Sequence, residues 1–156
     1  MIDTTRTTHP SAPELVTRRA HDAAVVRIDG PTADLPRLLG EAFELTASAI
    51  HASGARIDGP PFARYLAIDP VVRAEVGFPF TGDLTPTDRV YRTTLPGGSA
   101  VKALHVGPYE ELGATWESIK TWIGAQGFTT RATPWESYLT DPDVVPPVTE
   151  VIFPID

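Results

Sequence analysis

The sequence contains no cysteine, which excludes disulfide bonds and metal sites built from thiolates. Basic residues are also scarce, because 13 Lys and Arg stand against 20 Asp and Glu. The formal net charge of −7 argues against a nucleic-acid-binding protein, since such affinity needs Lys and Arg concentrated on one surface. No apolar run approaches the roughly 18 residues of a membrane-spanning helix. We therefore expect neither nucleic acid nor a membrane as a partner.

Motifs for metal, phosphate and nucleophile chemistry are missing as well. The four histidines lack metal-ligand spacing such as H-E-x-x-H, and no Gly-rich phosphate loop or G-x-S-x-G motif occurs. His105 ends a predicted strand, where a structural or hydrogen-bonding role is favoured over a catalytic one. We expect no metal and no cofactor.

The bulk composition is that of one globular domain. The chain has 156 residues, of which 42% are hydrophobic, and 16 prolines favour turns and sheet edges over a helical bundle. Residues 1–13 are polar and Thr-rich without the apolar core of a signal peptide, so they are predicted to form a flexible tail. The expectation is a single domain over residues 14–156 in the cytoplasm.

Hydrophobic periodicity and turn residues predict two helices among many strands. An apolar stripe at three- and four-residue spacing predicts a helix from Thr32 or Asp34 to Gly54, and a second one runs from Tyr109 to Ala125. Hairpins are expected at the His21-Asp22 turn and at Pro96-Gly97-Gly98. The predicted strands are 15–19, 23–28, 62–68, 72–78, 90–95, 99–106, 132–139 and 148–155.

The second half of the chain repeats the first. Gly30-Pro31 recurs as Gly107-Pro108, 77 residues later, while positions beyond the helix recur at an offset of 73. The four residues lost are about one helical turn, so the second helix should be one turn shorter. The later matches pair Gly54, Pro61, Tyr65 and Leu66 with Gly127, Pro134, Tyr138 and Leu139, and residues 74–79 with 149–154.

This repeat predicts the architecture. Residues 14–80 and 90–156 each read as a β-β-α-β-β unit, and a pseudo-twofold axis would relate the two. The fold class is therefore α+β, with antiparallel sheets and two helices around a central ligand cleft.

The strand around Glu136 carries the candidate site. Side chains alternate between the two faces of a strand, so Glu136 and Tyr138 point one way, and Trp135 with its alternate neighbours points toward the helix. A strand glutamate is more often a solvated outer-face residue, and it is the aromatic neighbours that favour a site here. The same alternation predicts a cleft with no basic residue that also holds Tyr65, Glu75, Glu150 and Ile152.

Several short runs in the second half resemble a known family. The runs Leu104-His105-Val106-Gly107-Pro108-Tyr109, Trp135-Glu136-Ser137-Tyr138-Leu139 and Thr149-Glu150-Val151-Ile152-Phe153-Pro154, with Trp116 between them, are similar to the GyrI-like (SOUL/GyrI-like) domain. This is also the effector-binding domain of bacterial transcription activators. The resemblance implies a duplicated fold whose cleft binds lipophilic, often cationic drugs, with Glu136 at the position of the family's acid. No helix-turn-helix is expected before residue 14, so a stand-alone member is favoured.

Three functions remain open at this stage. As a receptor, the protein would place an ionised Glu136 opposite a bound cation, with Tyr65, Tyr138, Trp135 and Tyr109 stacking on a planar ligand. Some stand-alone members of the family resemble hydrolases that open the cyclopropane ring of DNA-alkylating natural products. In such an enzyme Glu136 would activate water, with Glu111 as a second acid. The third function is inhibition of gyrase or another protein by an acidic surface. The ligand, the oligomeric state and turnover stay open.

Overall fold

The computed structural model describes residues 12–141 and 143–156, so the tail expected at 1–13 lies outside it except for Ala12 and Pro13. The chain divides into two compact units. Unit 1 combines the segment ending at Arg18 with Gly98–Asp156, and unit 2 is Arg19–Gly97. Each unit packs one α-helix against an antiparallel sheet, which confirms the α+β class.

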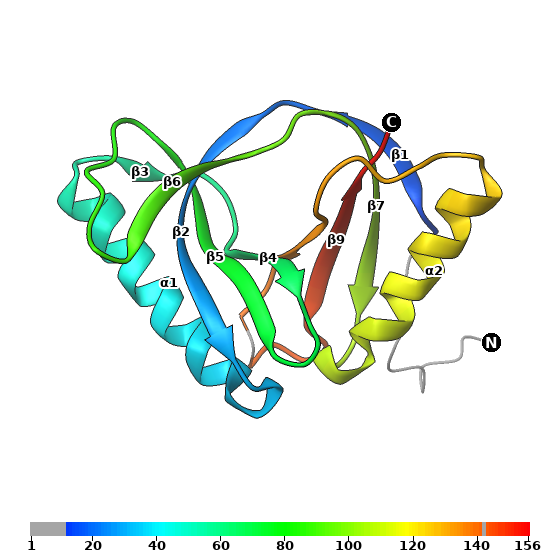
Figure 1. Cartoon of the computed structure of the whole chain (residues 1–156), viewed down its shortest axis with the longest axis horizontal. Coiled ribbons are helices and arrows are strands. Elements are labelled where there is room, and N and C mark those ends of the chain that lie inside the picture. Colours follow the sequence, from blue (N-terminus) through cyan, green and yellow to red (C-terminus); the bar gives the residue numbers. More distant parts are fainter. Residues whose placement is uncertain (1–11, 142) are drawn as a thin grey trace. The chain divides into compact units, whose positions relative to one another are not determined.

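Unit 2 is built on the long strand β5. Its neighbours are β4 on one side and β2 on the other, and β6 pairs with the far edge of β2. Helix α1 lies along the face formed by β2 and β5 (Figure 1). The elements are β2 (His21–Gly30), α1 (Leu35–Ala52), β3 (Arg56–Ile57), β4 (Phe62–Ala67), β5 (Val72–Thr81) and β6 (Val90–Leu95).

Unit 1 repeats this plan around the strand β9. The sheet order is β1-β7-β9-β8, and helix α2 covers β7 and β9. The helix buries Leu112, Ile119 and Ile123 against Val151 and Phe153 of the sheet. The elements are β1 (Glu14–Arg18), β7 (Gly98–Val106), α2 (Leu112–Ala125), β8 (Trp135–Tyr138) and β9 (Val148–Pro154).

The predicted repeat appears in the local structure. Helix α1 has 18 residues and α2 has 14, which is the predicted difference of one turn. Each helix follows a Gly-Pro step and a short 3-10 turn, at Thr32–Asp34 and Tyr109–Glu111. Each is followed by a glycine in the left-handed region, Gly54 at φ 75° and Gly127 at φ 80°.

Both hairpins expected at the strand-rich starts of the repeats are wrong. Strand β1 pairs with β7 instead of β2, and β6 pairs with β2 instead of β7. The physical reason lies in the linkers Arg19-Ala20 and Pro96-Gly97. A two-residue hairpin needs a positive φ at its first loop residue or at both loop residues. The first residues of these linkers, Arg19 and Pro96, are not glycines, and no described non-glycine residue has a positive φ. Each short strand therefore completes the sheet that carries the other repeat.

The bounds of some strands differ from the predicted bounds. Strand β8 is shorter than the predicted 132–139, and the two-residue strand β3 was too short to show periodicity.

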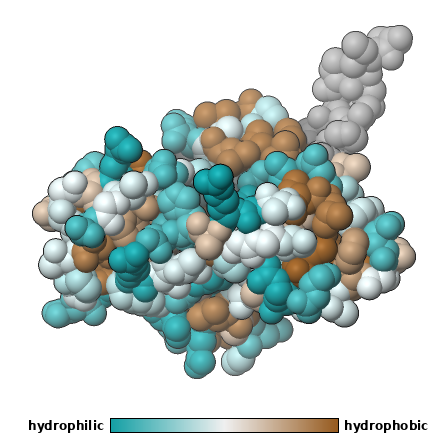
Figure 2. All heavy atoms as spheres, turned by 90° about the horizontal axis from the view of Figure 1, so that it is seen from above, coloured by the Kyte–Doolittle hydropathy of each residue, from teal (hydrophilic) through white to brown (hydrophobic). Residues whose placement is uncertain are grey.

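Neither helix in the described part of the chain combines the length and hydrophobicity required to cross a membrane. Figure 2 shows one face, on which hydrophobic atoms form separate small patches among hydrophilic ones.

Strand β5 approaches the backbone of β2 closely at Gly77. A Cβ atom there would lie 1.8 Å from the carbonyl oxygen of Ala24, so we expect Gly77→Ala to lower the free energy of unfolding by about 3 kcal/mol. Gly40, on the exposed side of α1, has nothing within 4 Å of a Cβ. Gly40→Ala should raise the same quantity by about 1 kcal/mol. Urea denaturation measures both, and equal effects would contradict the close approach.

Candidate functional site

The carboxylate of Glu136 is buried in unit 1 and holds two neutral donors. Its side chain is on β8, and the residue is only 6% exposed. The indole Nε1 of Trp116 donates a hydrogen bond of 2.6 Å to one oxygen, and the hydroxyl of Tyr138 donates one of 2.8 Å to the other. Among the residues that the structure describes, no Lys, Arg or His forms an ion pair with this acid. A buried carboxylate without a cation is energetically costly and so marks a candidate site.

Aromatic rings surround this acid because of how α2 begins. Trp116 lies on the buried stripe of α2, and its ring meets Phe153 edge-on with centroids 5.1 Å apart. Tyr109, in the 3-10 turn before the helix, meets Tyr138 edge-on at 6.0 Å. Tyr109 is 36% exposed, so it stands between the buried acid and solvent. Three aromatic side chains, those of Trp116, Tyr138 and Tyr109, thus border the acid and form an aromatic enclosure around it.

Burial raises the pKa of Glu136 above its ordinary value of 4.5, although the hydrogen bonds from Tyr138 and Trp116 oppose the shift. The pKa of Tyr109 is also raised, first by burial and then by the negative charges of Glu136 and Asp141. The enclosure is thus electronegative, and it favours a cation or a shared proton.

The prediction that Glu136 and Glu150 share one face of the sheet is wrong. In the β8–β9 ladder Glu136 pairs with Val151, which contacts α2, whereas Ser137 pairs with Glu150. Glu136 and Tyr138 therefore lie on the face that α2 covers. The opposite face carries Trp135, Ser137, Glu150 and Ile152, where Glu150 lies 3.6 Å from Lys102.

The size of Trp135 explains this error. A large aromatic side chain suggested the helix-covered face, but both faces of β8 are buried, and Trp135 and its partner Ile152 are each 0% exposed. The guanidinium of Arg18 from β1 lies 5.5 Å from the ring centre of Trp135, a cation–π contact. Hydrophobicity alone therefore could not distinguish the faces.

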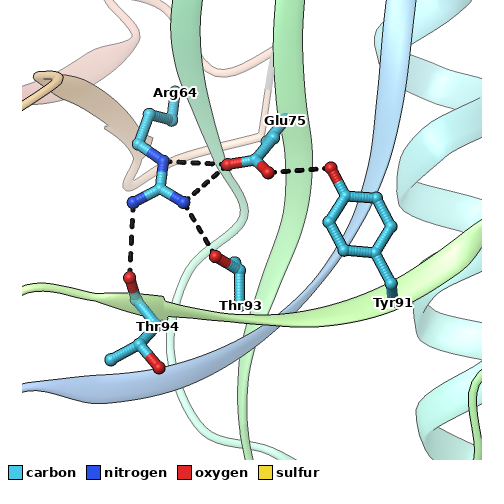
Figure 3. A network of polar contacts seen from close by, with 5 residues as sticks. All are labelled: Arg64, Glu75, Tyr91, Thr93 and Thr94. Atoms are coloured by element: carbon cyan, nitrogen blue, oxygen red, sulfur yellow. Dashed lines mark hydrogen bonds and ion pairs between the residues drawn. The ribbon is translucent and has the colours of Figure 1, made fainter.

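The prediction that Tyr65 and Glu75 lie on the same face of the unit 2 sheet is also wrong. Glu75 pairs with Arg64 in the β4–β5 ladder, whereas Tyr65 pairs with Ala74 and faces the other way. The guanidinium of Arg64 donates from Nε and Nη2 to one oxygen of Glu75, at 3.0 and 2.5 Å, and Tyr91 donates to the other at 2.7 Å (Figure 3). The expectation of no basic residue beside these acids is thus wrong for Glu75, and also for Glu150, which forms an ion pair with Lys102. The role of Glu75 as a ligand contact stays a prediction, but its charge is already neutralised.

Unit 2 provides an internal reference for the polar groups around Glu136. Across β7, β9 and β8 of unit 1 runs the row His105–Thr149–Tyr138, and the matching row of unit 2 is Ile28–Ala74–Tyr65. One step along, Glu136 pairs with Val151 where Ala63 pairs with Val76. The same frame folds with Ile28, Ala74 and Ala63, all buried, in these places. The fold does not require the polar groups of unit 1.

Three residues near the acid were not predicted as site residues. Trp116 was assigned to the core alone, and Thr149 was not considered. His105 has the predicted structural role, with Thr115 Oγ1 at 2.7 Å from Nδ1 and the carbonyl of Pro108 accepting from Nε2 at 2.8 Å. The sequence repeat did contain a signal for Thr149, because this threonine occupies the position that Ala74 has in the first repeat.

Glu111 lies at the end of the 3-10 turn and is exposed, so Tyr109 is the residue of this turn that borders the acid. The described residues contain no group of three His, Asp or Glu side chains placed to hold a metal ion. The side chains that surround the carboxylate of Glu136 include those of Tyr138, Tyr109 and Trp116.

The raised pKa of Glu136 predicts how stability depends on pH. The native state binds this proton more tightly than the unfolded chain, so the free energy of unfolding falls as pH rises from about 4.5 through the raised pKa. Glu136→Gln removes this proton linkage, because the amide does not titrate. Urea denaturation over this pH range should show the variant gaining on the wild type.

The matched control is Glu117→Gln, because the Glu117 side chain is 72% exposed on α2. Its difference from the wild type should stay flat over the same pH range. Parallel curves for Glu136→Gln and the wild type would show that the acid has an ordinary pKa in the folded protein.

Comparisons with known proteins agree with this fold. The chain resembles the C-terminal domain of EcmrR at a TM-score of 0.80 and 17% identity, covering 92% of this chain and 96% of that one. A hydrolase from Listeria innocua matches at a TM-score of 0.68 and 18% identity, covering 95% and 94%. EcmrR in a complex with DNA matches at 0.77 and 17%, covering 96% of this chain but 57% of that one. These likenesses show a shared fold.

No curated protein matches the sequence. The family model of the GyrI-like small molecule binding domain matches residues 68–156, which is more than half of the chain and includes all of α2, β8 and β9. The chain belongs to the GyrI-like small-molecule-binding domain family.

Proposed function

We propose that the protein binds lipophilic cations, planar ones included, at Glu136. The observation that carries this proposal is the buried carboxylate, which the described residues supply with two neutral donors and no cation. In the other repeat the same position is Ala63, so the acid is not there to support the fold. A ligand cation would offset the cost of burying an ionised Glu136.

The aromatic rings supply the rest of the affinity. Tyr109 and Tyr138 present one edge-on pair beside the acid, and Trp116 adds an indole from α2. Each cation–π contact contributes about 1 kcal/mol, and burial of apolar ligand surface adds more without requiring one ligand shape. This combination supports broad recognition of drug-like molecules. The predicted contacts Tyr65, Trp135, Glu150 and Ile152 stay predictions, although Trp135, Glu150 and Ile152 lie on the sheet face opposite Glu136.

The acid predicts a difference between ligands of equal shape. Glu136→Gln should weaken a rhodamine cation by about a hundredfold, because a buried charge pair is lost, and a neutral dye of the same shape by less than about threefold. Fluorescence titration measures both affinities, with Glu117→Gln as the control that removes an exposed charge from the same unit. An equal loss for both dyes would mean that Glu136 shapes the site without neutralising a charge.

Cation binding should also depend on pH. A permanent cation requires the ionised acid, and the raised pKa means that Glu136 releases its proton at a higher pH than an ordinary glutamate does. Affinity for the cation should therefore rise with pH through that pKa and then level off, by up to about tenfold per pH unit on the rising part. Calorimetry in buffers of different ionisation enthalpy should detect the released proton. A pH-independent affinity, or one that falls as pH rises, would contradict this linkage.

A hydrolase is the second candidate, and the raised pKa of Glu136 favours it. A carboxylate with a raised pKa is a stronger base than an ordinary one and takes a proton from water more readily. For a cyclopropane conjugated to a carbonyl, the oxygen of water would bond to a ring carbon while Glu136 takes its proton. The ring C–C bond breaks, and its electron pair passes to the carbonyl oxygen, which gains a proton. The similar fold of the Listeria innocua hydrolase agrees with this reaction without establishing it.

Chromatography separates the two candidates. A cyclopropane-bearing alkylator is incubated with the wild type, Glu136→Gln and Glu111→Gln. A ring-opened product that disappears only with Glu136→Gln would establish hydrolysis without a need for Glu111, and loss with both would make Glu111 the second acid. Saturable dye binding with unchanged alkylator would leave binding as the function. A pull-down with gyrase tests the remaining alternative of a protein target.

A further inference from the structure

Thr149 is the residue whose chemistry the fold leaves unused. Among the described residues, Thr149 Oγ1 and Trp135 Nε1 are buried side-chain atoms without a hydrogen-bond partner. Thr149 is 0% exposed, and an unpartnered buried hydroxyl destabilises a protein. The two atoms lie on opposite faces of the unit 1 sheet, because Thr149 pairs with Tyr138 and Trp135 pairs with Ile152. Of these two residues, Thr149 is the one that lies on the same face as Glu136.

Thr149 lies next to the acid on this face. It faces Tyr138 across the β8–β9 ladder, and Glu136 faces Val151, two residues further along β9. The Cα atoms of such diagonal neighbours in a sheet are about 7 Å apart. Thr149 is therefore the unpartnered polar group nearest in the ladder to Glu136.

Neighbouring residues do not explain the hydroxyl. His105, its partner on β7, already uses both ring nitrogens with Thr115 and the carbonyl of Pro108. In unit 2 the same place is Ala74, which is equally buried and equally placed between two strands. Neither the fold nor the histidine requires a hydroxyl at this position.

We propose that the Thr149 hydroxyl is a specificity-determining contact of the Glu136 site. The site should then prefer lipophilic cations that also carry a carbonyl, ether, hydroxyl or N–H group over cations without any such group. This inference rests on the proposed binding at Glu136 and names the ligand class more narrowly. A hydroxyl both donates and accepts, so it selects for the presence of a hydrogen-bonding group rather than for one polarity.

Two substitutions separate the hydroxyl from the shape of the side chain. Thr149→Val keeps the shape and removes the hydroxyl, and Thr149→Ser keeps the hydroxyl and removes a methyl group. Because the hydroxyl has no partner in the free protein, Thr149→Val should raise the thermal midpoint by a few degrees. Thr115→Val is the contrast, since its hydroxyl is bonded to His105 and its loss should lower the midpoint.

The binding arm uses two lipophilic cations. A rhodamine ester carries a carbonyl oxygen, whereas tetraphenylphosphonium has no hydrogen-bonding group. Thr149→Val should weaken the rhodamine ester about tenfold and leave tetraphenylphosphonium within about twofold of the wild type. Thr149→Ser should keep the preference for the rhodamine ester. Fluorescence titration and competition measure these affinities.

The outcomes are distinguishable. A lower thermal midpoint for Thr149→Val, an equal loss for both cations, or no loss for the rhodamine ester would overturn the role of Thr149 while leaving the proposed function intact. A wild type that binds neither cation would overturn both proposals. A higher midpoint together with a selective loss for the rhodamine ester would support Thr149 as the ligand contact.

Discussion

The burial of one carboxylate is the constraint on which the site depends. Glu136 is held by an indole N–H from α2 and a phenol O–H from its own strand, so two neutral dipoles take the place of a cation. Such dipoles stabilise the ionised form only in part, and burial still raises the pKa of the acid. The free protein therefore keeps an acid that gains from any positive charge brought to it. This imbalance is what distinguishes the site from a structural ion pair.

Unit 2 shows how a buried glutamate looks when a cation neutralises its charge. Glu75 accepts from Arg64 through two donors and from Tyr91 through a third, and Arg64 also donates to Thr93 and Thr94 (Figure 3). The charge is neutralised and most hydrogen-bonding capacity is used. Glu136 lacks such an arrangement within the described residues. Among the described residues, Glu75 thus has a cation that neutralises its charge and Glu136 has none, although both acids lie in antiparallel sheets.

The duplication allows equivalent positions of the two repeats to be compared within one chain. Where unit 2 has Ile28, Ala63 and Ala74, unit 1 has His105, Glu136 and Thr149. Both sets are buried in matching ladders, and so the apolar set shows what the frame requires. The polar set is an addition to that frame. The aromatic position, Tyr65 and Tyr138, is common to both and belongs to the scaffold as well as to the site.

Local sequence signals determined the elements of this protein, the one-turn difference between α1 and α2, and Glu136 as the candidate acid. Hydrophobic period and helix-stopping glycines act within a few residues, so the sequence displays them directly. Which strands pair, and which face of β8 meets α2, depends on contacts between distant segments. Alternation shows that Glu136 and Tyr138 share a face, but with both faces buried it cannot choose between them. Only the tertiary structure brought Trp116 and Thr149 to the acid, because long-range register decides those neighbours.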